Sequence, residues 1–176
     1  MKKFGEWQGR RSRANRREHP EISLFFVVLL LMGLHMGCVR HPVPPINKTP
    51  DNLAIKGYDS VAYFTEGRPV LGLPAYEITW NGATWRFASE EHREMFRQSP
   101  EMYAPRYGGY CAYAVSQGKT ADIDPDAWTI VDNRLYLNLN KDVQGLWDRN
   151  RREYIRQADK NWPHLSGERN PANAQK

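Results

Sequence analysis

The stretch from residue 80 to residue 113 most limits the folds that are open to this chain of 176 residues. Residues 76–80 and 83–87 alternate apolar and polar side chains on either side of Asn81-Gly82. Asn-Gly tolerates the positive φ angles of a two-residue turn, so this pattern predicts an antiparallel β-hairpin. A fold built around local hairpins is therefore expected.

A helix is predicted directly after this hairpin. Ser89 is a favourable N-cap residue, and His92, Met95 and Phe96 follow at the spacing that places side chains on one helix face. Ser99-Pro100 predicts the start of a second, short helix, since proline suits the first helical position.

The remaining elements complete an α+β pattern. Residues 61–64 form a β-prone run, residues 128–131 and 135–137 predict a second hairpin, and residues 142–161 carry the apolar stripe of a helix. We therefore expect one small domain, with an antiparallel sheet of hairpins and helices packed on one side.

The N-terminus has the pattern of a targeting segment. Seven Lys and Arg residues precede an apolar run over residues 22–37, and Cys38 follows Gly37, as at a bacterial lipoprotein cleavage site. We therefore interpret residues 1–37 as a signal or anchor segment and Cys38 as a lipidation candidate, with an uncleaved anchor as the alternative. Either case places the rest of the chain on the periplasmic side of the cell envelope, because positive charge stays cytoplasmic.

The rest of the chain divides into a linker, a domain and a tail. Residues 38–51 are rich in proline and predict a semi-rigid spacer, residues 52–165 form the domain, and residues 166–176 form a polar tail that is expected to fray. The leader holds seven of the 25 basic and three of the 20 acidic residues, so residues 38–176 are nearly neutral. The basic composition therefore does not favour nucleic acid as a partner. The expected partner is the membrane, through the N-terminal anchor.

Two residues are candidates for chemistry. Cys111 is the only cysteine left once Cys38 is assigned to the anchor, and Gly108-Gly109 before it permits a sharp turn or a close approach to another segment. His92 lies in the first turn of the predicted helix. Lone residues of both kinds are often only core residues, so burial remains the alternative for each. His41 and His164 are interpreted as solvated. The chain has no recognisable hydrolase motif, and an enzyme is the less favoured interpretation.

Long segments of the domain resemble the YHS-domain proteins, in the exported branch that includes members described as selenoproteins. The segments that carry the resemblance are 57–64, 80–96, 99–118, 122–140 and 158–165. Related small YHS and TRASH-like domains bind heavy metals, particularly copper, through cysteines. Ala62 and Ala88 occupy two of those cysteine positions here, and His92 lies close to the third.

These observations lead to one functional hypothesis and two alternatives. The leading hypothesis is a membrane-anchored domain that binds a soft metal ion, with copper preferred, through Cys111 and His92, because thiolate and imidazole suit Cu(I). Met95 or Met102 would be available as an additional thioether ligand. The alternatives are a redox protein that uses Cys111 as a single reactive thiol, and a structural or interaction module in which Cys111 is buried.

Overall fold

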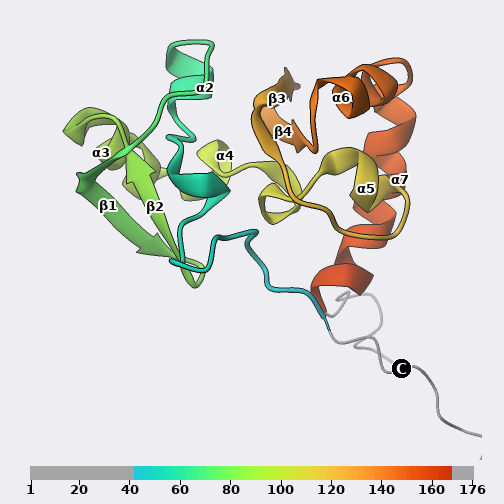
Figure 1. Cartoon of the computed structure of the whole chain (residues 1–176), viewed down its shortest axis with the longest axis horizontal. Helices are drawn as coiled ribbons and strands as arrows, with labels where there is room; N and C mark the ends of the chain where they lie inside the picture. The colour runs from blue at the N-terminus through green and yellow to red at the C-terminus, as the bar shows by residue number, and fades with distance from the viewer. Residues whose placement is uncertain (1–41, 168–176) are drawn as a thin grey trace, which may run out of the picture. The chain divides into compact units, whose positions relative to one another are not determined.

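The computed structural model describes residues 42–167 (Figure 1). The predicted leader, Cys38 and His41 lie outside the described residues. The buried hydrophobic residues described range from Ile46 to Ala158, so this segment has a hydrophobic core of its own. The α+β class is confirmed.

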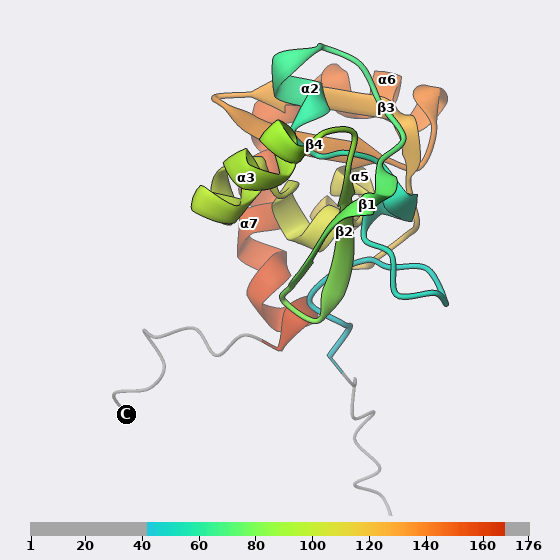
Figure 2. The ribbon, with the colours of Figure 1, turned by 90° about the vertical axis from the view of Figure 1, so that its left-hand side faces the viewer.

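The elements follow the chain in this order: η1 (Ile55–Gly57), α2 (Ala62–Thr65), β1 (Leu73–Trp80), β2 (Ala83–Phe87), α3 (Glu90–Gln98), α4 (Pro100–Tyr103), η2 (Arg106–Gly109), α5 (Ala112–Ser116), β3 (Asp124–Val131), β4 (Arg134–Asn138), α6 (Lys141–Asp148) and α7 (Arg151–Ser166). The strands form two separate two-stranded antiparallel sheets, β1-β2 and β3-β4. In Figure 1 the first sheet lies with α2 and α3, and the second lies with α5, α6 and α7; Figure 2 shows the same two groups one behind the other.

Both predicted hairpins are confirmed, and their turns explain why. Asn81 and Gly82 have φ angles of 49° and 76°, and Asp132 and Asn133 have 49° and 57°. Two consecutive positive φ angles are typical of the tight turn that matches the twist of a hairpin. The strands pair directly beside each turn, Trp80 with Ala83 and Val131 with Arg134.

The helix predicted after Ser89 is also confirmed as α3. The Ser89 hydroxyl accepts a hydrogen bond from the backbone N–H of His92 at 3.1 Å, which satisfies one of the free donors in the first turn. The short helix predicted at Pro100 is α4, with proline in its first turn.

Two predicted elements are wrong. Residues 62–64 fall in the short helix α2, with Val61 as its N-cap residue, and not in a strand. The Asp59 carboxylate accepts hydrogen bonds from the backbone of Val61 and Ala62 and holds the chain in a turn. The single helix predicted over residues 142–161 is divided into α6 and α7. Asn150 has a non-helical backbone at the break, which lets Trp147 and Ala158 both become fully buried.

Strand β4 is shared by two hydrophobic clusters. Leu135 and Leu137 belong to the cluster around Trp85 and Phe96, which is built mainly from the first half of the domain. Tyr136 belongs to the second cluster, with Trp147. Neighbouring side chains of a strand point to opposite faces, so one hydrophobic cluster packs against each face of β4.

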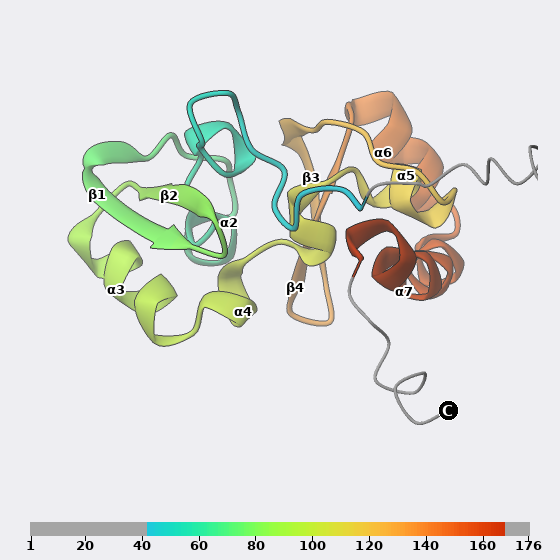
Figure 3. The same cartoon turned by 90° about the horizontal axis from the view of Figure 1, so that it is seen from below.

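The proline-rich segment is not a free spacer from residue 42 onward. The Val43 amide donates to the Leu165 carbonyl at 2.9 Å, the Asn47 amide donates to the Gly108 carbonyl at 2.8 Å, and Ile46 is buried in the core. A Cβ atom on Gly108 would lie 2.0 Å from the Pro45 carbonyl oxygen, so this approach requires glycine. Figure 3 shows the segment running beside the η2 turn.

The C-terminal helix continues further than the sequence pattern suggested. Helix α7 runs through Pro163 to Ser166, and Leu165 packs against the second cluster. The polar tail was predicted to begin at residue 166; Ser166 is the last residue of α7, and residues 168–176 lie outside the described residues.

Candidate functional site

His92 is oriented by a buried carboxylate. Asp59 is fully buried, and its Oδ2 atom lies 2.6 Å from the Nδ1 atom of His92. The same carboxylate accepts hydrogen bonds from the backbone amides of Val61, Ala62 and Ala88. These donors compensate for the loss of water around the charge. Asp59 therefore joins the start of α2, the end of β2 and the first turn of α3 at one point.

The second nitrogen of His92 faces a hydroxyl group. Its Nε2 atom lies 3.2 Å from the Thr65 Oγ1 atom, and that hydroxyl is also 3.2 Å from the Val61 carbonyl oxygen. The His92 side chain is only 12% exposed. With Nδ1–H donated to Asp59, Nε2 is left to accept a hydrogen bond or to bind a ligand. The arrangement fixes one tautomer and one ring orientation.

Cys111 lies in a different polar environment. The side chain is 1% exposed, and its sulfur accepts a hydrogen bond from the Ala114 amide at 3.5 Å as the N-cap of α5. The thiol donates to the Asn138 Oδ1 atom at 3.7 Å. Burial raises the pKa of the Cys111 thiol, although hydrogen bonds from nearby backbone amides act in the opposite direction. A buried thiol with a raised pKa is a poor nucleophile at neutral pH.

The two predicted ligands, Cys111 and His92, therefore have separate polar partners in the structure. Neither shares a hydrogen-bonding group with the other. Among residues 42–167, no group of three or more His, Cys, Asp and Glu side chains is placed to hold a metal ion. That search does not address a two-ligand site, so the Cys111–His92 pairing stays a prediction. His164 is exposed, as expected.

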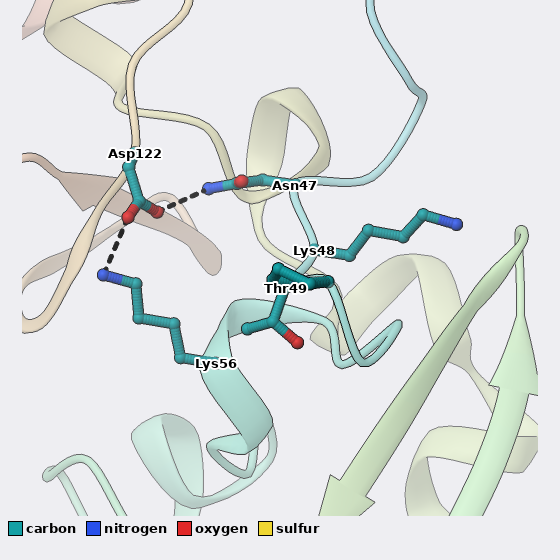
Figure 4. A pocket seen from close by; sticks show the side chains of 6 residues that line it. Asn47, Lys48, Thr49, Lys56 and Asp122 are labelled. Atoms are coloured by element: carbon teal, nitrogen blue, oxygen red, sulfur yellow. Dashed lines mark hydrogen bonds and ion pairs between the residues drawn. The ribbon is translucent and has the colours of Figure 1, made fainter.

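A small pocket lies where the N-terminal segment meets η1 (Figure 4). Asp122 forms an ion pair with Lys56 at 2.9 Å and accepts a hydrogen bond from the Asn47 side chain at 3.2 Å. Burial alone would raise the pKa of Asp122, but the hydrogen bonds from Lys56, the Ile123 backbone and Asn47 lower it overall. Figure 4 shows the Lys48 side chain directed away from this carboxylate. The polar contacts of this pocket thus hold the N-terminal segment against the domain.

A larger groove has a different lining. It has a volume of about 480 Å³ and lies between the turn of the first hairpin, the η2 region and the end of α7. Its lining combines aromatic rings, prolines and two arginines; the residues are Trp80, Asn81, Glu101, Ala104, Pro105, Arg106, Tyr107, Arg134, Asp159, Trp162 and Pro163. Aromatic faces with a few fixed polar groups are typical of binding sites.

The two arginines of this groove are held differently. Arg106 forms an ion pair with Asp159 at 3.0 Å, and the Tyr107 hydroxyl also donates to Asp159. Arg134 donates to the Glu101 carbonyl at 3.0 Å and has no carboxylate in ion-pair range within the described part of the chain. Its guanidinium group keeps donors available for an anion.

Comparison with known proteins found no matching protein family, no matching curated protein and no matching solved structure. Assignment of the chain to the YHS-domain proteins is therefore a proposal. No helix within residues 42–167 is both long and apolar enough to cross a membrane.

The sequence identified His92 and Cys111 but missed their partners. Asp59 precedes the run at residues 61–64 that was interpreted as a strand, and the signal that identifies it is its place three residues before the first residue of α2, where its side chain can accept from the backbone of the first turn. Asn138 gave no signal, because a buried amide looks like any polar strand residue. The groove also gave none, since its lining comes from separate segments.

Proposed function

We propose that this chain is an exported, membrane-anchored domain of the YHS type that acts as a structural or interaction module, with Cys111 in a structural role. The observation that carries the proposal is the state of the Cys111 thiol. It is buried, its pKa is raised, and both hydrogen-bonding roles of its sulfur are used, toward Ala114 and Asn138. A thiol in this setting stabilises the first turn of α5 and does not favour redox chemistry.

A second candidate function is the binding of a soft metal ion, copper above all, through His92 and Cys111. The orientation of His92 by Asp59 favours it, because histidines that bind metals commonly donate their other ring nitrogen to a carboxylate. Joining both ligands to one ion would require Cys111 to exchange its hydrogen bonds with Asn138 and Ala114 for a metal bond. That rearrangement places this candidate second.

One set of measurements separates these functions. We would purify residues 42–176 with the thiol reduced, then measure alkylation of Cys111 at neutral pH and the uptake of Cu(I). The structural role predicts slow alkylation that becomes fast only in denaturant, and no stoichiometric copper. His164→Ala serves as the matched control for His92→Ala, since His164 is exposed.

Two results would overturn the structural role. Stoichiometric Cu(I) uptake that Cys111→Ser abolishes and His92→Ala weakens, with no effect of His164→Ala, would establish the metal site. Rapid alkylation of the native protein without metal would instead favour the single-thiol redox function.

A further inference from the structure

The docked N-terminal segment restricts how the domain can lie on a membrane. Val43 is hydrogen-bonded to Leu165, so only residues 39–42 separate the lipidation candidate Cys38 from the body of the domain. An extended chain across these positions spans at most about 18 Å. An anchored domain would therefore keep the end of α7 close to the headgroups.

The aromatic groove lies at this same end. Trp162 and Pro163 belong to the groove, and Leu165, two residues further along α7, holds Val43. A Cβ atom on Gly167 would lie 2.6 Å from Pro42, so the described ends of the chain are adjacent. The attachment point and part of the groove thus both lie at the C-terminal end of α7.

The chemistry of the groove suits a lipid interface. Tryptophan is enriched where protein meets headgroups, and two partly exposed tryptophans, Trp80 and Trp162, line the groove. Arginine binds phosphate with several donors at once. Arg134, which has no carboxylate partner within residues 42–167, provides such a group, held in place by the Glu101 carbonyl.

We propose that the groove lined by Trp80, Trp162 and Arg134 docks onto the phosphate headgroups of an anionic phospholipid surface. The inference rests on the proposed membrane anchoring and adds to it a defined orientation, with the end of α7 against the membrane and the start of α7 away from it. The 16 residues of α7 place these two ends about 24 Å apart.

The test uses residues 42–176, which lack the anchor but contain the whole described core. Vesicles of phosphatidylglycerol mixed with phosphatidylethanolamine are compared with vesicles of neutral phosphatidylcholine, by sedimentation and by quenching of tryptophan fluorescence with brominated lipid. The domain should bind the anionic vesicles. Arg134→Gln should weaken the binding about five-fold, the contribution of one basic side chain near an anionic surface. Arg152→Gln is the matched control, because it removes the same charge near the start of α7 and Arg152 is exposed.

Other outcomes overturn the inference. Equal losses for the two variants would mean general charge attraction, and an absence of binding to anionic vesicles would remove the docking surface. Competition by inorganic phosphate alone at millimolar concentration would identify a free anion site. Fractionation of the full chain tests anchoring separately. A soluble full chain would contradict the anchor, even if the isolated domain binds lipid. A membrane-bound full chain whose isolated domain does not bind lipid would contradict only the docking.

Discussion

Replacement of Asp59 by asparagine should destabilise the domain strongly, although the two side chains have nearly the same shape. One carboxylate oxygen accepts from the amides of Val61 and Ala62, and the other accepts from Ala88 and His92. An asparagine has one acceptor oxygen, so its NH2 group must face one of these pairs of donors. The least costly orientation keeps the oxygen toward Val61 and Ala62 and lets His92 change its tautomer.

The cost follows from what remains unpaired. The partly buried Ala88 amide loses its acceptor, which costs about 1–3 kcal/mol, and the remaining hydrogen bonds lose the strength given by a charged acceptor, about 1 kcal/mol each. Relief from burying a charge offsets part of this sum. We expect Asp59→Asn to lower the free energy of unfolding by about 3 kcal/mol.

Urea denaturation of residues 42–176, followed by tryptophan fluorescence and circular dichroism, measures this change. With a slope of about 2 kcal/mol per molar urea, the midpoint should fall by about 1.5 M. Asp124→Asn is the matched control, because within residues 42–167 Asp124 accepts one backbone hydrogen bond, from Asp126, and asparagine can keep it. A midpoint shift for Asp59→Asn no larger than that of the control would refute the role of Asp59 as a junction of three segments.

Three further predictions follow from the same structure. Cys111→Ser should stay within about 1 kcal/mol of the original protein in urea denaturation, because serine also caps helices, whereas Cys111→Ala should lose about 1–2 kcal/mol; the reverse order would argue against a capping thiol. Gly108→Ala should cost at least about 3 kcal/mol in thermal or urea unfolding, because its Cβ would overlap the Pro45 carbonyl, while Gly82→Ala, at a similar φ but in open space, should cost about 1 kcal/mol. Because the folded pKa of Asp122 lies below its ordinary value of 3.8, its contribution is present above that value and is lost as the pH falls through the folded pKa. Asp122→Asn should therefore destabilise the protein at pH 7 and match it at low pH, and an equal difference at both pH values would contradict the ion pair with Lys56.

The parts of the fold that the sequence predicted are those decided by local physics. Asn81-Gly82 and Asp132-Asn133 accept positive φ angles in any context, and Ser89 caps a helix through atoms only three residues away. Such elements need no information about distant segments. They were identified with nearly correct bounds.

The errors occur where distant contacts decide the structure. Residues 61–64 have the composition of a strand, but the Asp59 side chain and its contacts with Ala88 and His92 impose a turn and a helix. The proline-rich segment was interpreted as a spacer because its burial depends on Gly108, more than 60 residues away along the chain. Composition alone does not reveal such a partner.

In the candidate site, too, the sequence predicted the local features and missed the contacts between distant segments. The sequence identified His92 and Cys111 from their residue types, but their hydrogen-bonding partners, Asp59 and Asn138, come from other elements. Whether a histidine and a cysteine meet at one ion depends on side-chain directions that periodicity does not encode.

The burial of β4 on both faces limits how this molecule can be divided. Leu135 and Tyr136 are neighbours in sequence but serve different cores, so a shift of this strand by one residue would disturb both at once. We expect neither half to be stable alone, because a cut leaves one half without β4 and exposes one face of β4 in the other half. Hydrogen exchange should accordingly show a single cooperative unit, with its slowest amides in residues 134–138.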